Sequence, residues 1–481
     1  MRATEALLAS YLDLARHLDP LRYPDESPQE IAHRLGQFDP ASMRAHVSAL
    51  RSIANALEDL DNIAELDDEV DRTMLLDSIR SDTVRLGGML ASETSNPALP
   101  LRHLNRALLV LMGEDFDAEC EAALRERIAA FPGFLESLQA DPRPAPVLIL
   151  ERARLEAGRF ADETLDMAAE RLDDATVQPA LVAIAEYRAW LNDDGREGGP
   201  YGFGEQHVEA RLATLGSEPL GAKGTLRLLE LRRAGVERSL AGAAEELGLT
   251  DPLACAQQLM DEAQPAPDIF DDFWADEWRR VGEALREAGL PIPDAEPPAG
   301  PLDAADGWSM AAHAVRDHAA RMMWVAKAMN PRPVRRLLRG PGLLDGWGRT
   351  VAALLRNSEA FGLPERRLMM SFLALRDCAA AEADLLLHSR AAGPDELMVR
   401  TQKIAGVSAE AARVIIGDIA ADPLHALGAA LAHEAWQGWY AEVGGEPVPF
   451  VLKAMLGGGL AVPLARWALE TGEASDGRRE T

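Results

Sequence analysis

The stretch MRAHVSALRSIANALEDL, residues 43–60, repeats apolar side chains every three or four positions. This period places them along one face of an α-helix and leaves the charged residues on the other face. The same period returns at residues 70–90, 225–248 and 407–420. Patterns that alternate apolar and polar residues, as half-buried strands do, are nearly absent. The sequence therefore predicts an all-α fold: one large helical assembly with little or no sheet.

Capping signals support the same prediction. In DESPQEIAHRLG, residues 25–36, Ser27 stands at an N-cap position, Pro28 at the first helical position and Gly36 at the stop. The best strand candidate is PAPVLILERARLEAG, residues 144–158. Its continuation into charged residues at helical spacing favours a helix there as well.

Two punctuated stretches suggest how the chain is organised. Residues 192–206 are rich in Gly and Asp, and residues 288–307 are rich in Pro and Gly. The first is expected to be a long loop that either shapes a cleft or simply links helices. We expect an N-terminal helical half at 1–215, a connector region at 216–300, a C-terminal helical half at 301–475 and a disordered tail at 476–481.

Composition limits the partners of this chain. Its 49 Lys and Arg residues face 78 Asp and Glu residues, which gives a formal charge of −29. Such a charge repels nucleic acid and anionic membranes, so neither is an expected partner. The three cysteines are far apart, the N-terminal stretch lacks the apolar run of a signal peptide, and no run reaches the ~20 apolar residues of a membrane span. These features predict a cytoplasmic protein, and they indicate no oligomeric state.

The stretch AAHAVRDHAARMM, residues 311–323, carries two histidines among small and apolar residues. His313 and His318 are five apart and point about 140° away from each other on a regular helix. One metal ion therefore cannot bind both unless the helix breaks. The helical zinc motif needs a spacing of four and a glutamate after the first histidine, where this chain has Ala314. His313 and Asp317 share a face and could form an ion pair.

Further segments follow in a recognisable order. GPGLLDGWGRTV, residues 340–351, contains Asp345 and Trp347; AEADLLLHSR, residues 381–390, contains Asp384 and His388; the late segment DPLHALG contains His425. With the apolar, glycine-interrupted residues 449–467, they resemble the bacterial domain-of-unknown-function 885 family. Its members are mostly helical and resemble zinc-dependent peptidases.

The resemblance implies a damaged zinc site. When His318 is placed on the second zinc histidine of the family, the first falls on Ala312 and the catalytic glutamate falls on His313. Asp345 stands where the family has its acidic ligand. The water-activating glutamate is then missing, and His318 and Asp345 remain as possible remnant ligands. A third ligand would have to come from His313, His388 or His425, because a catalytic zinc normally has three protein ligands.

Two interpretations follow from the resemblance. In the first, the chain is a degenerate peptidase-like protein without a cofactor. It keeps a polar pocket near His318, Asp345, Asp384 and His388, with Trp347 and His313 beside it, and binds a peptide or a small carboxylate ligand. In the alternative, His313, His318 and Asp345 hold zinc and His388 or His425 transfers protons, as in a metal-dependent hydrolase or a repurposed biosynthetic enzyme.

The remaining motifs give weaker indications of function. His433 and Glu434 are adjacent, but Gln437 stands where a zinc helix has its second histidine, so this helix is not predicted to bind zinc. Trp436, Trp439 and Tyr440 at helical spacing predict core residues. The basic cluster RPVRRLLRG, residues 332–340, could hold a carboxylate or phosphate, although pairing with nearby acids is the favoured interpretation.

Overall fold

A computed structural model describes most of the chain, namely residues 3–18, 38–60, 65–112, 116–215, 220–262, 269–297, 307–338, 342–356, 358 and 361–476. Three expectations lie wholly or partly outside these residues: the helix at 27–36, the end of the 288–307 connector and the tail after 476.

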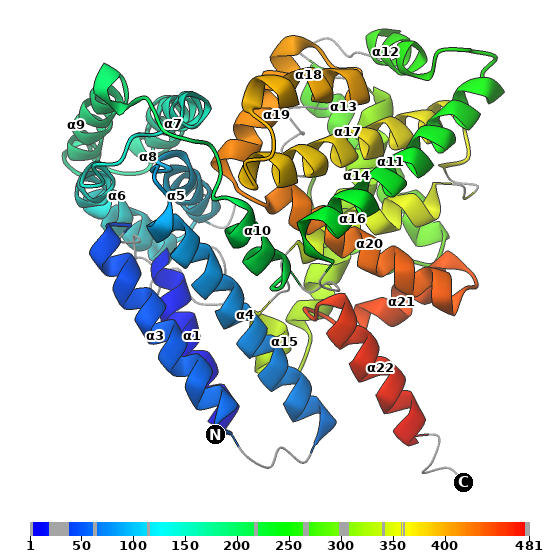
Figure 1. Cartoon of the computed structure of the whole chain (residues 1–481), viewed down its shortest axis with the longest axis horizontal. Coiled ribbons are helices and arrows are strands. Elements are labelled where there is room, and N and C mark those ends of the chain that lie inside the picture. Colours follow the sequence, from blue (N-terminus) through cyan, green and yellow to red (C-terminus); the bar gives the residue numbers. More distant parts are fainter. Residues whose placement is uncertain are drawn as a thin grey trace.

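The described residues form helices joined by short turns and loops (Figure 1). The helices of the first half are α1 (Ala3–Leu18), α3 (Pro40–Glu58), α4 (Leu66–Ala91), α5 (Ala98–Leu111), α6 (Ala118–Gln139), α7 (Val147–Arg159), the π-helical turn η2 (Phe160–Thr164), α8 (Leu165–Ala169), α9 (Asp174–Leu191), the short 3-10 turn η3 (Asp194–Arg196) and α10 (Glu205–Leu212). Those of the remainder are α11 (Gly221–Glu246), α12 (Pro252–Glu262), α13 (Phe270–Glu287), α14 (Gly307–Ala328), α15 (Pro333–Leu337), α16 (Leu343–Leu355), α17 (Pro364–His388), α18 (Pro394–Ala405), α19 (Ala409–Ala421), α20 (His425–Val443), α21 (Pro447–Met455) and α22 (Val462–Asp476).

The all-α prediction is confirmed. No strand occurs in the described part of the chain, where one isolated bridge joins Ala145 to Glu197. The segment that was the best strand candidate forms the helix α7. Of the loop expected at 192–206, residues 192–204 form a loop that η3 interrupts, and the last two residues begin α10.

Helix α3 shows why the opening stretch folds as it does. Asp39 caps its first turn by accepting hydrogen bonds from the backbone N–H groups of Ala41 and Ser42, and Pro40 fills the first position. The side chains that α3 buries include Val47 and Leu50, at the spacing that the apolar pattern predicts. They pack with α1 and α4, which lie beside α3 (Figure 1).

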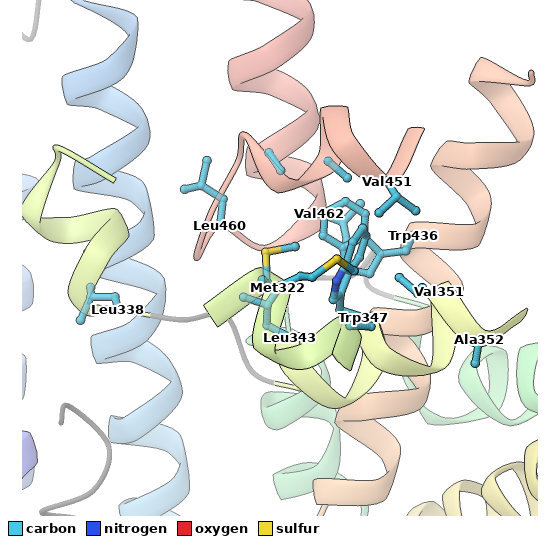
Figure 2. Packing of buried hydrophobic residues seen from close by; sticks show 14 of the residues in the cluster. Met322, Leu338, Leu343, Trp347, Val351, Ala352, Trp436, Val451, Leu460 and Val462 are labelled. Carbon is cyan, nitrogen blue, oxygen red and sulfur yellow. The ribbon is translucent and has the colours of Figure 1, made fainter. Parts of the chain in front are cut away.

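The largest apolar core joins distant parts of the sequence. It contains Leu50 of α3 and Val70 of α4 together with Trp347 of α16, Trp436 of α20 and Val451 of α21. Figure 2 shows the C-terminal part of this core, where the side chains from α16, α20 and α21 meet. The core tryptophans predicted at 436 and 439 are confirmed, with 1% and 2% of their surface exposed, and Tyr440 packs against this core while partly buried.

A second core is centred on α5 to α9. It takes residues such as Phe131 and Tyr187 from these helices, and Leu387 and Ile416 from α17 and α19. Both large cores therefore contain residues from before and after position 215. The division at 215 and 300 stays a prediction.

The basic cluster ties α15 to α4. Arg335 donates through Nε to Asp71 Oδ1 at 2.8 Å, and Arg332 donates through Nε to Asp71 Oδ2 at 2.6 Å. Asp67 and Asp68 accept further hydrogen bonds from the same arginines. The cluster is paired with acids, as expected, but these acids lie more than 250 residues away in sequence, and Arg335 is buried and not part of a solvated helix face.

Within the described residues, no single helix is long and apolar enough to cross a membrane. Helices α19 and α20 satisfy the length and composition criteria only when taken together, and they meet at 88°.

Candidate functional site

Helices α11, α14, α16, α17 and α20 surround a cavity with about 610 Å³ of empty space, open solvent included. We call it the arginine cavity. Its lining residues are Leu229, Arg232, Ala312, Arg316, Arg349, Ala352, Ala353, Arg356, Met370, Ala374, Asp377, Cys378, Ala430, His433 and Glu434.

Helix α14 places Ala312 and Arg316 on this cavity. They are one turn apart and so share a face. His318 lies six residues after Ala312, which puts it about 120° around a continuous helix. Its ring packs on Trp278 of α13 at 4.0 Å between centroids, and its Nε2 lies 2.9 Å from the Trp278 carbonyl oxygen. Burial lowers the pKa of His318. The side chain is thus a buried packing residue of the α13–α14 contact.

Two glycines let α16 approach its neighbours closely. A Cβ on Gly346 would lie 2.6 Å from Ala432 Cβ and 2.8 Å from the Ala429 carbonyl oxygen, both on α20. A Cβ on Gly348 would lie 2.9 Å from the Arg316 carbonyl oxygen of α14. The close approach brings Arg349 and Arg356 to the same cavity as Arg316.

Asp377 of α17 holds two of the arginines. Its Oδ2 lies 2.8 Å from Arg316 Nη2, and its Oδ1 lies 3.2 Å from Arg349 Nη2. Burial alone would raise the pKa of Asp377, but Arg316, Arg349 and His313 outweigh it and lower the pKa. Asp377 is therefore ionised. Arg316 Nε and Arg349 Nη1 are buried without a hydrogen-bond partner.

Arg232 of α11 is held by α20. Its Nε lies 3.1 Å from Glu434 Oε1, and its Nη2 donates to His433 Nε2. Because Nε2 accepts, the proton of a neutral His433 sits on Nδ1, which lies 2.8 Å from Thr350 Oγ1. The Thr350 hydroxyl in turn donates to the Gly346 carbonyl oxygen. His433 is thereby fixed in one orientation and one tautomer.

Arg356 differs from the other three arginines. Its Nη1 donates to Ser371 Oγ at 3.2 Å. No carboxylate of the described residues pairs with it. Burial lowers its pKa, and the charges of Arg232 and Arg367 lower it further. With His433 neutral, the described lining carries an excess of two positive charges, because four arginines face Asp377 and Glu434.

His433 predicts a pH dependence of stability. Burial, followed by the charges of Arg232, Arg349, Arg316 and Arg356, holds its pKa well below the usual range. The folded protein therefore resists protonation of this ring, whereas the unfolded chain binds a proton near pH 6.5. The stabilisation from His433 is complete above that pH and is lost as the pH falls below it.

We expect the wild-type protein to lose about 2 kcal/mol more unfolding free energy between pH 7.5 and pH 5 than His433→Gln does. Urea titrations at the two pH values measure the difference. Equal losses in the two proteins would show that His433 is not the titrating group.

Two other predicted residues meet at the surface. His425 Nε2 at the start of α20 lies 3.3 Å from Asp345 Oδ2 in the first turn of α16, and both side chains are more than half exposed. An exposed pair of this kind contributes little to stability. Asp345 thus contacts His425, whereas His318 contacts α13. Trp347 is buried in the core against Trp436, at 5.0 Å between ring centroids.

Asp384 and His388 are close together, at 3.5 Å between Oδ1 and Nε2. Asp384 accepts hydrogen bonds from the backbone N–H groups of Leu424 and Leu427, and burial raises its pKa to about 7. His388 Nε2 lies 3.1 Å from the Ile419 carbonyl oxygen, and burial lowers the pKa of His388 to about 4. The pair joins α17 to the turn between α19 and α20.

His388 also borders a second cavity, between the N-terminal helices and α17, with about 1030 Å³ of empty space including open solvent. The loop at 192–206 contributes Phe203, whose ring stacks on His388. The principal cations of this cavity are engaged: Arg143 binds Asp141 and two carbonyl oxygens, and Arg211 binds Ser81. The arginine cavity, with its uncompensated charge, is the stronger candidate site.

A metal site is not assembled in the described part of the chain. No group of three or more His, Cys, Asp or Glu side chains there has an arrangement that could hold a metal ion. Of the possible zinc-site residues, His313 lies near Asp377, while His318 and Asp345 have the separate neighbours described above.

The sequence did not lead us to predict Arg232, Arg349 and Arg356 as site residues. His433 was considered only as a zinc ligand and was not predicted to be one. One feature of the sequence could have indicated two of these arginines. Arg349 and Arg356 are seven residues apart on either side of the mainly apolar run TVAALL, so they share one face of the predicted helix.

Comparison with known proteins bears on the fold. No protein-family model and no curated protein matches this sequence. A solved "putative lipoprotein of unknown function" from Shewanella oneidensis is similar at 14% identity and a TM-score of 0.71, covering 97% of this chain and 99% of its own. A "putative lipoprotein" from Colwellia psychrerythraea is similar at 11% identity and a TM-score of 0.74, covering 98% and 99%. At such identities the likeness shows a shared fold over nearly the whole length.

Proposed function

We propose that this chain binds a small anionic molecule, with the carboxylate or phosphate of the ligand held in the arginine cavity. One observation carries the proposal. On a chain with a charge of −29, the described lining of this cavity carries two more positive than negative charges. A local cationic surface inside an acidic protein favours an anionic ligand over other solutes.

The energetic reason lies in desolvation. Partly burying a guanidinium group costs free energy unless a counter-charge or hydrogen bonds compensate it. Among the described residues Arg356 has no acidic partner, and Arg316 and Arg349 each keep a buried nitrogen without a hydrogen-bond partner. A bound anion would supply these partners. Guanidinium groups suit carboxylate and phosphate because their N–H groups match two oxygens at once.

The resemblance to a peptidase-like family supports the location. It places the first zinc histidine at Ala312, which lines this cavity, and it places the water-activating glutamate of the family at His313. A small apolar side chain at this position leaves space for a ligand instead of a metal. We therefore propose a degenerate peptidase-like scaffold that binds a small carboxylate or the carboxylate of a peptide. Neither this proposal nor its test depends on the predicted cytoplasmic location.

The test uses Arg356→Met. We expect wild-type protein to bind at least one of acetate, adipate and inorganic phosphate in calorimetric titrations, and the variant to bind it 10- to 100-fold more weakly, since a charge-assisted hydrogen bond contributes about 1.5–3 kcal/mol. Without ligand, the variant should be as stable as the wild type or more stable, because it removes an uncompensated charge. If Arg356 had only a structural role, Arg356→Met would not weaken anion binding while keeping or raising stability.

The matched control is Arg279→Met on α13, which removes one exposed positive charge paired with Asp276. It should leave the affinity unchanged. Equal affinities for wild type and Arg356→Met, or no binding of any of these anions at millimolar concentration, would contradict the proposal. Metal-dependent hydrolysis stays a prediction, and about one equivalent of zinc in protein purified without chelator would support it instead.

A further inference from the structure

The excess positive charge of the arginine cavity lies at two separate places. Arg349 and Arg356 both line the cavity and are seven residues apart, and the backbone of Arg356 keeps helical geometry at the end of α16. Two helical turns separate their Cα atoms by about 10 Å along one face.

The residues of α17 that bind these arginines are separated by a similar distance. Asp377 pairs with Arg316 and Arg349, and Ser371 accepts from Arg356. These two α17 residues are six apart, or about 9 Å along the helix axis. We call the surroundings of Asp377 the first end and the surroundings of Ser371 the second end.

Each end keeps one positive charge that no carboxylate of the described residues balances. At the first end, two arginines share the single carboxylate of Asp377. At the second end, Arg356 has a hydroxyl as its partner. Arg232 adds no excess, because Glu434 balances it and the low pKa of His433 keeps that ring neutral.

Small apolar side chains line the stretch between the ends. Ala352 and Ala353 lie between the two arginines on α16, and Ala374 lies between Ser371 and Asp377 on α17. Alanine side chains are small and apolar, and they offer a hydrocarbon chain no hydrogen bond. They would bury its methylene groups favourably.

We infer that the ligand is an elongated dianion of the α,ω-dicarboxylate class, with one carboxylate at each end of the cavity and an apolar chain over the alanines. The inference rests on the proposed anion-binding function and specifies its ligand class. An elongated dianion matches the number of excess charges and the spacing along α16 and α17 of the residues at the two ends, whereas a compact anion is expected to reach only one end.

The experiment titrates the full chain with succinate, glutarate, adipate, pimelate and suberate, and with hexanoate as the monoacid matched to adipate. We expect affinity to pass through a maximum along the dicarboxylate series. The best dicarboxylate should bind at least 10-fold more tightly than hexanoate. Arg356→Met should reduce that advantage to less than threefold.

A second variant tests the middle of the cavity. Ala353→Leu should weaken the best dicarboxylate at least 10-fold and leave the binding of inorganic phosphate within twofold of wild type. If hexanoate or phosphate binds as tightly as every dicarboxylate, or if chain length has no effect, the elongated dianion is wrong while the anion site stands. If no anion binds, the proposed function and this inference both fail.

Discussion

Gly346→Ala is expected to lower the free energy of unfolding by about 3 kcal/mol, near the upper end of the usual cost of overpacking. The new Cβ would lie within 3.0 Å of Ala432 Cβ, the Ala429 carbonyl oxygen and the His433 backbone nitrogen. Two of these three atoms belong to the backbone of α20, so no rotamer change can relieve the contact. Helix α16 would have to move away from α20. Urea denaturation measures the loss.

The same displacement should weaken anion binding, because Arg349 lies one turn after Gly346. The control is Gly438→Ala on α20, where a Cβ meets nothing within 4 Å. It should leave stability unchanged or raise it by up to about 1 kcal/mol, since alanine is the better helix former. If both variants had equal stability, the close packing of α16 on α20 would be refuted.

Asp71→Ala is expected to destabilise the fold by about 3 kcal/mol, at the lower end of the cost of breaking a buried ion pair. Asp71 and Arg335 have side chains only 7% and 9% exposed, and Asp71 also accepts from Arg332. Removing the carboxylate leaves two guanidinium groups with fewer acceptors near the interior. Asp67 and Asp68 still contact these arginines, which limits the loss.

The comparison for this prediction is Asp77→Ala, also on α4. Asp77 has a half-exposed side chain and lies 4.0 Å from Arg80. Its removal should change the unfolding free energy by less than about 0.5 kcal/mol. A loss of similar size for both variants would mean that α15 and α4 are not joined through Asp71.

The residues considered for a zinc site show which contacts can be inferred from spacing along the sequence and which cannot. The angle between positions on a helix excluded a shared metal for His313 and His318. It could not show that His318 packs on Trp278, because that contact depends on how α13 crosses α14. Asp345 and His425 do lie together, yet at the surface. Asp384 and His388 are four residues apart on α17 and lie close together, while a backbone group that Asp384 binds comes from Leu424, 40 residues later.

The arginine cavity shows the same limit. Each of its arginines resembles an ordinary helix residue in the sequence. All five helices around the cavity supply an arginine or a carboxylate to an ion pair with another of these helices. The negative charge of the whole chain gave no sign of a local positive excess, because net charge does not report which residues meet.

The sequence by itself determined that this protein is helical, where many of the helices lie and which of their faces are apolar. Those properties depend on residues three or four positions apart. Only the tertiary structure decided that α4 is joined to α15, that glycines bring α16 against α20, and that four arginines share one cavity with two carboxylates. These contacts join residues that are tens to hundreds of positions apart, and helix crossing determines them through side-chain volume and charge.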